Sequence, residues 1–185
     1  MKKIFVILCL SIFLISCKST KTSAGGLRPV YITNSKKVNL LPAANAGQVF
    51  DGLQLLNGSF GTQSFSLLSY TQIDESGISL SLMNDFGADM GNVFYDGNQV
   101  IFDSAYFSKA LPGEYIICDI QNAYYDEAAL RENYKAVGLR FEAESGSRRI
   151  YDANKLIEEI LFLENTVIIK NLLRGYEYNL TRIEE

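Results

Sequence analysis

The residues of this chain that could do chemistry are its hydroxyls, carboxylates and lysines, because the sequence contains no histidine. Without histidine, Ser-His-Asp and Cys-His nucleophilic sites and histidine metal sites are excluded. Serine–lysine and paired-carboxylate chemistry stay open on composition alone. Glu158 and Glu159 are adjacent acids in an expected strand, where neighbouring side chains point to opposite faces, so they make a poor acid/base pair. We therefore expect that the protein is not an enzyme.

Metal and phosphate sites are equally weakly indicated. Residues 85–87 (DFG) match a kinase tripeptide, but no glycine-rich phosphate loop accompanies them. Arg148 and Arg149 could meet a phosphate headgroup, although a charged hairpin end is the favoured interpretation. Four acids could supply a loose calcium site, yet they lack the spacing of an EF-hand loop and are interpreted as solvated turn charges. These acids are Asp74, Glu75, Asp85 and Asp89. We expect no metal and no cofactor.

The N-terminal residues indicate export. Lys2 and Lys3 precede an apolar run over residues 4–15, which is too short for the roughly 20 residues of a membrane span and is typical of a signal peptide. The run ends in residues 14–17 (LISC), which resemble the bacterial lipobox. This resemblance implies that Cys17 receives a diacylglycerol thioether and becomes the first residue of the mature protein. The alternative is an ordinary signal peptide with a chance cysteine.

Acylation of Cys17 would anchor the protein to a membrane, since each buried acyl methylene contributes roughly 0.8 kcal/mol. In lipobox proteins an aspartate directly after the cysteine favours the inner membrane, whereas residues 18–20 here are KST. The resemblance therefore implies a lipid anchor in the outer membrane, on its periplasmic face. Cys118 is the one cysteine left besides Cys17 after signal removal, so we expect no intramolecular disulfide and interpret Cys118 as a small core residue.

Composition divides the chain into three parts. We expect a signal peptide over residues 1–16, the lipidated cysteine and a flexible basic tether over residues 17–44, and one folded domain over residues 45–185. Residues 18–44 carry five basic residues and no acid, whereas residues 45–185 carry ten basic and twenty-one acidic residues, a net charge of −11. The basic tether suits anionic lipid headgroups, and the acidic domain argues against nucleic acid as a partner.

The domain has the pattern of a mainly β protein. Residues 78–82 (ISLSL) alternate strictly, which predicts a half-buried strand, and Asp96-Gly97 predicts a tight hairpin. The period changes to a helical one over residues 111–134, where Asp126 is well placed to cap a second short helix. Further strands are expected before and after this region. They comprise residues 65–70, 93–95, 99–102, 139–143, 149–151, 157–163, 166–170 and 176–180.

Four segments carry a resemblance to a known family. Residues 77–87 (GISLSLMNDFG) and the following residues 92–95 (NVFY) look like the centre of LolB, the outer-membrane lipoprotein receptor. Residues 118–121 (CDIQ) and 175–180 (GYEYNL) look closer to a LolB-like lipoprotein family of unassigned function. Members of that family are often encoded beside aryl-polyene or fatty-acid-type biosynthesis genes. The resemblance implies an α+β fold: an incomplete antiparallel β-barrel with a short helical lid between the first and second groups of strands.

The same resemblance points to one loop residue. In LolB an apolar residue protrudes from the loop after this strand and takes part in delivering lipoprotein to the membrane. The matching residue is Phe86, although Asp85 stands where LolB has a proline. Polar and flexible neighbours, Asp85 and Gly87, favour exposure of Phe86. A turn residue folded back on the core is the alternative.

Apolar stripes on single strand faces could line a ligand cavity or form an ordinary core. These ten candidates are Ile78, Leu80, Leu82, Val100, Phe102, Leu139, Phe141, Tyr176, Tyr178 and Leu180.

Together these features predict a lipid-anchored carrier or acceptor, with the membrane and an amphiphilic ligand as partners and an envelope protein as a conceivable donor. The ligand would be a lipid, lipoprotein acyl chains or a polyene lipid. The alternative is an envelope assembly or scaffold lipoprotein that uses the same fold to bind a protein.

Overall fold

The computed structural model describes residues 29–104, 106–107 and 112–183, and within these ranges the fold is mainly β. A short strand pair, β1 (Val30–Tyr31) and β2 (Lys37–Val38), is followed by the 3-10 helix η2 (Ala43–Asn45). The next strands are β3 (Phe50–Phe60), β4 (Gln63–Asp74), β5 (Gly77–Met83), β6 (Asp89–Tyr95) and β7 (Val100–Asp103). Then come the helices α2 (Gly113–Tyr124) and α3 (Glu127–Lys135). The last strands are β8 (Arg140–Glu144), β9 (Ser147–Asp152), β10 (Lys155–Phe162), β11 (Thr166–Asn171) and β12 (Tyr176–Arg182).

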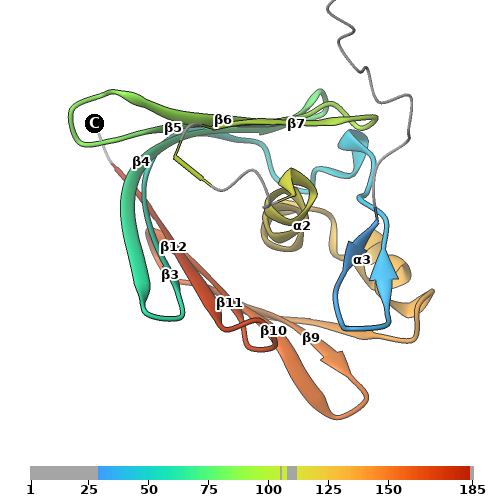
Figure 1. Cartoon of the computed structure of the whole chain (residues 1–185). Coiled ribbons are helices and arrows are strands. Elements are labelled where there is room, and N and C mark those ends of the chain that lie inside the picture. The colour runs from blue at the N-terminus through green and yellow to red at the C-terminus, as the bar shows by residue number, and fades with distance from the viewer. Residues whose placement is uncertain (1–28, 105, 108–111, 184–185) are drawn as a thin grey trace, which may run out of the picture.

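Strands β3 to β12 form one antiparallel sheet in the order β7-β6-β5-β4-β3-β12-β11-β10-β9-β8. Two meanders meet along β3 and β12, where Leu56 lies opposite Leu180. The edge strands β7 and β8 are not hydrogen-bonded to each other, so the sheet is open. In Figure 1 the sheet bends around α2, which lies on its concave side.

The prediction of strands before and after a helical region is confirmed. In β5, Ile78, Leu80 and Leu82 are buried, whereas Ser79 and Ser81 are more exposed, as the alternation indicated. Strand β3 is one that the pattern did not indicate. Its residues 53–56 (LQLL) place a buried Gln54 on the concave side and half-buried leucines on the other side, so the usual alternation is absent.

The two expected helices are present between the two groups of strands. Pro112 directly precedes α2, where its missing N–H costs no helical hydrogen bond. Asp126 caps α3, because its carboxylate accepts a hydrogen bond of 2.9 Å from the backbone N–H of Ala129. The ring of Tyr134 stacks on Phe141 at 5.9 Å and so packs α3 against β8.

The prediction of a flexible tether over residues 17–44 is wrong for the part that the structure describes. Val30 and Val38 are each 2% exposed and belong to the core, and Ile32, Leu40 and Ala43 are buried as well. The buried apolar residues stand two apart in two short pairs, Val30 with Ile32 and Val38 with Leu40, and polar residues 33–37 separate the pairs. The folded domain therefore begins well before residue 45.

The expected signal peptide and Cys17 lie outside the described residues. Among the residues that are described, no helix has the length and apolar character needed to cross a membrane.

Candidate functional site

The ten cavity candidates come together on the concave side of the sheet. Six of them are at most 4% exposed, namely Ile78, Leu80, Leu82, Leu139, Phe141 and Leu180. Val100, Phe102 and Tyr178 are half-buried and pack against the same core, and Tyr176 joins it through a ring contact of 5.1 Å with Tyr178. Helix α2 adds Ile117, Ile120 and Ala123 to this core. In this state α2 covers the concave face and fills much of it.

A second group of aromatic rings lies between β4, β7 and the segment after β7. The ring of Phe107 contacts Phe65 edge-on at 5.4 Å and Phe102 at 6.3 Å. The ring of Phe65 occupies the space above Gly58, where an added Cβ would lie 2.1 Å from it. All three rings are half-buried, so this part of the apolar interior is accessible to solvent.

Phe86 stands on a tightly hydrogen-bonded loop between β5 and β6. The side-chain oxygen of Asn84 accepts hydrogen bonds from the N–H groups of Phe86 at 3.0 Å and Ala88 at 2.9 Å. Gly87 adopts a φ of +76°, which glycine tolerates without strain. Phe86 is 95% exposed. The alternative that it folds back on the core is therefore wrong, and the loop presents a large apolar side chain to solvent.

A buried polar network joins both helices to the sheet. The carboxylate of Glu158 in β10 accepts a hydrogen bond of 2.8 Å from the amide of Asn122 in α2. The hydroxyl of Tyr134 in α3 donates to the other end of Asn122 at 2.7 Å. On the other side, the amide of Asn171 in β11 lies 3.4 Å from the second oxygen of Glu158. Glu158 is 1% exposed, so these partners replace its hydration.

The network continues to a second buried carboxyl group, Asp119 in α2. The hydroxyl of Tyr176 in β12 lies 2.8 and 3.0 Å from its two oxygens. The amide of Asn171 lies 3.3 Å from the same hydroxyl and so connects the two acids. Asp119 is 5% exposed. One acid therefore belongs to the helix and the other to the sheet, and polar side chains bridge them.

Burial changes the proton affinity of both acids. Burial raises the pKa of Glu158 to about 7, although the hydrogen bond from Asn122 acts in the opposite direction. Burial and the nearby charge of Glu158 raise the pKa of Asp119 well above its usual range, while Tyr176 and the Arg174 charge act to lower it. The pair therefore holds a proton at pH values where a solvated carboxyl group has lost it.

This network was missed by sequence reasoning. Asp119 and Asn122 lie three residues apart in α2 among buried apolar positions, which was the available signal. Glu158 was correctly expected to point away from Glu159, but nothing in the pattern indicated that it would face α2.

Arg148 is a structural residue and not a headgroup site. Its guanidinium group donates hydrogen bonds of 3.0 Å to the backbone oxygens of Asn122 and Tyr125 at the C-terminal end of α2. A cation in this position is favoured by the helix dipole. Arg149 points the other way and binds Glu144 and Glu159, which fits the charged hairpin end.

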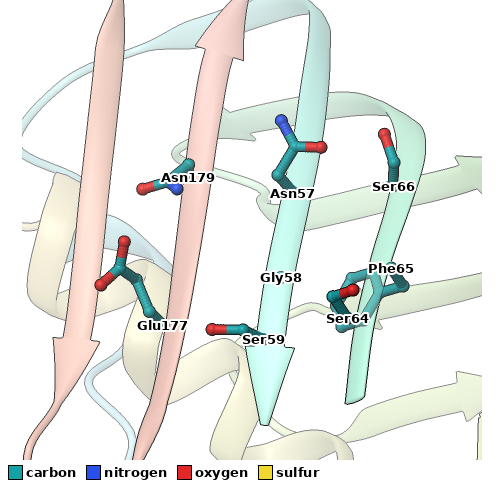
Figure 2. A pocket seen from close by; sticks show the side chains of 8 residues that line it. All are labelled: Asn57, Gly58, Ser59, Ser64, Phe65, Ser66, Glu177 and Asn179. Carbon is teal, nitrogen blue, oxygen red and sulfur yellow. The ribbon is translucent and has the colours of Figure 1, made fainter. Parts of the chain in front are cut away.

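A recess of about 370 Å³ is lined by polar side chains of β3, β4 and β12 together with Gly58 and Phe65. Figure 2 shows these residues. Because Leu56 faces the core, its neighbour Asn57 faces away from α2, opposite Ser66 and Asn179 in the adjacent strands. Ser59 lies between Ser64 and Glu177 in the next outward-facing row. The amides, hydroxyls and carboxylate that line this recess suit a polar molecule rather than an acyl chain.

The described residues contain no cluster of three or more cysteine and acidic side chains arranged to hold a metal ion. The comparisons with known proteins identify a family but no function. No curated protein matches this sequence. Residues 52–184 match a family model described as "Protein of unknown function (DUF3261)", which covers well over half of the chain, and the protein therefore belongs to that family.

Proposed function

We propose that this protein is a lipid-anchored carrier or acceptor of an amphiphile, acting on the periplasmic face of the outer membrane. The observation that carries the proposal is the open antiparallel sheet bent around α2, with an apolar concave face under the helix. This arrangement supports the half-barrel with a helical lid that the resemblance to LolB-like lipoproteins implies. An acyl chain would enter between α2 and the sheet.

The free energy of binding is the balance between burial of the acyl chain and displacement of α2. An acyl chain leaving water gains roughly 0.8 kcal/mol for each methylene that it buries, and the apolar face that it contacts must first lose α2. The half-buried rings of Phe65, Phe102 and Phe107 are partly accessible to solvent and form the proposed entrance. Transfer direction then follows from affinity differences between donor, carrier and membrane.

The proposed membrane contacts point in the same direction. An acylated Cys17 would keep the domain at the membrane surface. Phe86, 95% exposed on its hydrogen-bonded loop, would insert its ring into the lipid interface, where an apolar side chain is stabilised. Together they would place the domain against the membrane from which the amphiphile comes or to which it goes.

The test is to find the amphiphile. Residues 18–185, which contain every described residue, are exported to a bacterial periplasm without an acylated cysteine and purified without detergent. Native mass spectrometry followed by organic extraction should then reveal a lipid bound at one molecule per chain. An unliganded mass from a lipid-replete envelope, with no uptake of added fatty acid or phospholipid, would reject the carrier.

A protein-binding assembly factor is the second candidate, and one observation favours it. Six of the ten cavity candidates are at most 4% exposed and already belong to the protein's own packed core. A concave face that stays filled would leave the outer surface and the sheet edges for a partner. Cross-linking of the anchored protein in intact cells should then capture one stoichiometric envelope protein, while extraction yields no lipid.

A further inference from the structure

Helix α2 is attached to the sheet by two kinds of contact. Ile117, Ile120 and Ala123 make apolar contacts with the core, which do not depend on pH. Asp119 and Asn122 make polar contacts with β10 and β12 through Glu158 and Tyr176. The second set crosses the boundary between helix and sheet and contains two acids, so its strength depends on their protonation.

The two acids have no close positive partner. Among the described residues, neither Asp119 nor Glu158 forms an ion pair. Arg174 is the cation that acts on Asp119, but its guanidinium group lies over the ring of Tyr115 at 5.1 Å and also donates to the backbone oxygen of Tyr31. Two ionised carboxylates here would therefore be buried with hydrogen-bond donors but without a cation to neutralise them.

The groups facing the acids from the surrounding elements do not titrate near neutral pH. The hydroxyls of Tyr134, Tyr176 and Tyr178 and the thiol of Cys118 all have pKa values raised by burial, so they stay protonated. Asn122 and Asn171 are neutral, and Arg174 is a permanent cation. The pH response of this interface therefore belongs to the two acids.

We propose that this network is a proton-controlled latch on the helical lid: it holds α2 on the sheet while the Asp119–Glu158 pair keeps a proton, and it loosens when both carboxyls ionise. The proposal deepens the carrier function above and rests on it for its biological role. Arg148, which holds the C-terminal end of α2, lies outside the titrating pair and would act as the pivot.

The direction of the pH effect follows from linkage. In the closed state burial raises the pKa of Glu158 from 4.5 to about 7, and opening returns the carboxyl group to water. Opening therefore releases a proton. The closed state has its full stability below about pH 4.5 and loses it as the pH rises through about 7. One proton released corresponds to a roughly tenfold change in the opening equilibrium per pH unit.

Cys118 supplies a native reporter of opening. It lies in α2, is 4% exposed and is the one cysteine of residues 18–185. Labelling of this chain with a thiol reagent is followed from pH 5 to pH 8. Each rate is divided by that of the urea-unfolded chain at the same pH, which removes the ionisation of the thiol itself. The protection of Cys118 should fall roughly tenfold per pH unit as the pH rises toward about 7.

Two neutral variants and one matched control test the assignment. Glu158→Gln should abolish most of the pH dependence of protection, and Asp119→Asn should reduce it independently. Glu159→Gln, a change at the neighbouring residue that faces Arg149, should leave the wild-type profile unchanged. A wild-type protection that does not vary with pH overturns the latch, and so does a profile that both Gln variants share.

Loss of the whole fold must be distinguished from opening of the lid. A reporter cysteine at Ile73, which is fully buried in β4, is placed in a Cys118→Ser background. Protection of this cysteine should exceed that of Cys118 at every pH, because opening of the lid costs less free energy than unfolding of the sheet. Equal protection at the two positions would show that Cys118 reports global unfolding and would also overturn the latch. None of these readouts uses a lipid. Absence of bound lipid would therefore reject the carrier function, whereas the pH dependence of Cys118 protection tests the latch by itself.

Discussion

Glu158 and Glu159 are consecutive residues of β10 whose carboxyl groups lie in opposite environments. Glu158 is 1% exposed and accepts a hydrogen bond from Asn122 beneath α2. Glu159 lies on the other face, where its carboxylate accepts a hydrogen bond of 2.9 Å from Arg149. Because side chains alternate along a strand, these two acids cannot act together as a catalytic pair. They are well matched for mutation, since the same substitution can be made on both sides of the sheet.

The first prediction concerns stability against pH. Because burial raises the pKa of Glu158 to about 7, the free energy of unfolding should fall as the pH rises from 5 to 7.5, by up to about 3 kcal/mol. Glu158→Gln should flatten this dependence. Urea unfolding followed by circular dichroism at half-unit pH steps measures both effects.

Glu159→Gln is the control for this prediction and should retain the wild-type slope. Asp74 and Asp96 do not confuse the measurement, because hydrogen bonds in their turns lower the pKa of each below its ordinary value. Their contribution to stability is lost only as the pH falls into the strongly acidic range. A free energy of unfolding that is constant between pH 5 and 7.5 would contradict the prediction.

The second prediction concerns the C-terminal end of α2. Arg148→Met should lower the free energy of unfolding by about 2 to 4 kcal/mol, because the backbone oxygens of Asn122 and Tyr125 lose their buried donor. Arg149→Met removes ion pairs that are partly exposed and should cost about 1 kcal/mol or less. Urea unfolding at pH 6 compares the two variants. Equal losses in the free energy of unfolding would show that Arg148 does not hold the C-terminal end of α2.

Much of this fold could be predicted, since a strand with one buried face carries its own signature. Residues 78–82 alternate, and Asp126 is followed by a helical pattern, so β5 and α3 were both located from local spacing. Strand β3 was not predicted, because its face toward α2 carries the polar Gln54 while half-buried leucines lie on the other face. The pairing of β1 with β2 was not predicted, because two-residue strands are too short for a period to be recognised.

In the candidate site, too, local features could be predicted from the sequence and tertiary contacts could not. Exposure of Phe86 was predictable, because a polar loop and an adjacent glycine are local features. The network around Asp119 and Glu158 was not, since the two acids are far apart in the sequence and meet only when α2 is laid across the sheet. Buried polar groups gain their partners from tertiary structure, which spacing along one chain segment does not reveal.

The third prediction concerns the contact between β3 and β4. Gly58→Ala should lower the free energy of unfolding by about 1 to 3 kcal/mol, because its Cβ would lie 2.1 Å from the ring of Phe65 and displace it toward Phe107. Gly52→Ala in the same strand is the control. A Cβ there meets nothing closer than 3.7 Å, so this change should be neutral or slightly stabilising. The double variant Gly58→Ala/Phe65→Leu should recover part of the loss.

The fourth prediction tests the proposed membrane contact. Phe86→Glu should weaken binding of residues 18–185 to phospholipid vesicles by at least about tenfold, since burying a phenylalanine contributes roughly 1.5 to 3 kcal/mol and a carboxylate would resist burial. Co-sedimentation with vesicles over a lipid titration measures the partition coefficient. Asn84→Ala should have a smaller effect in the same direction, because the loop loses two of the hydrogen bonds that hold Phe86 outward.

Phe60→Glu is the matched control for this membrane contact. Phe60 is also an exposed phenylalanine, 60% exposed, but it lies at the end of β3 beside the β3–β4 turn and not in the β5–β6 loop. If any exposed aromatic side chain promotes vesicle binding, both glutamate variants should bind equally poorly. If the β5–β6 loop faces the membrane, Phe60→Glu should bind like the wild type while Phe86→Glu does not. Wild-type binding by Phe86→Glu would remove the loop from the membrane contact and leave Cys17 as the proposed anchor.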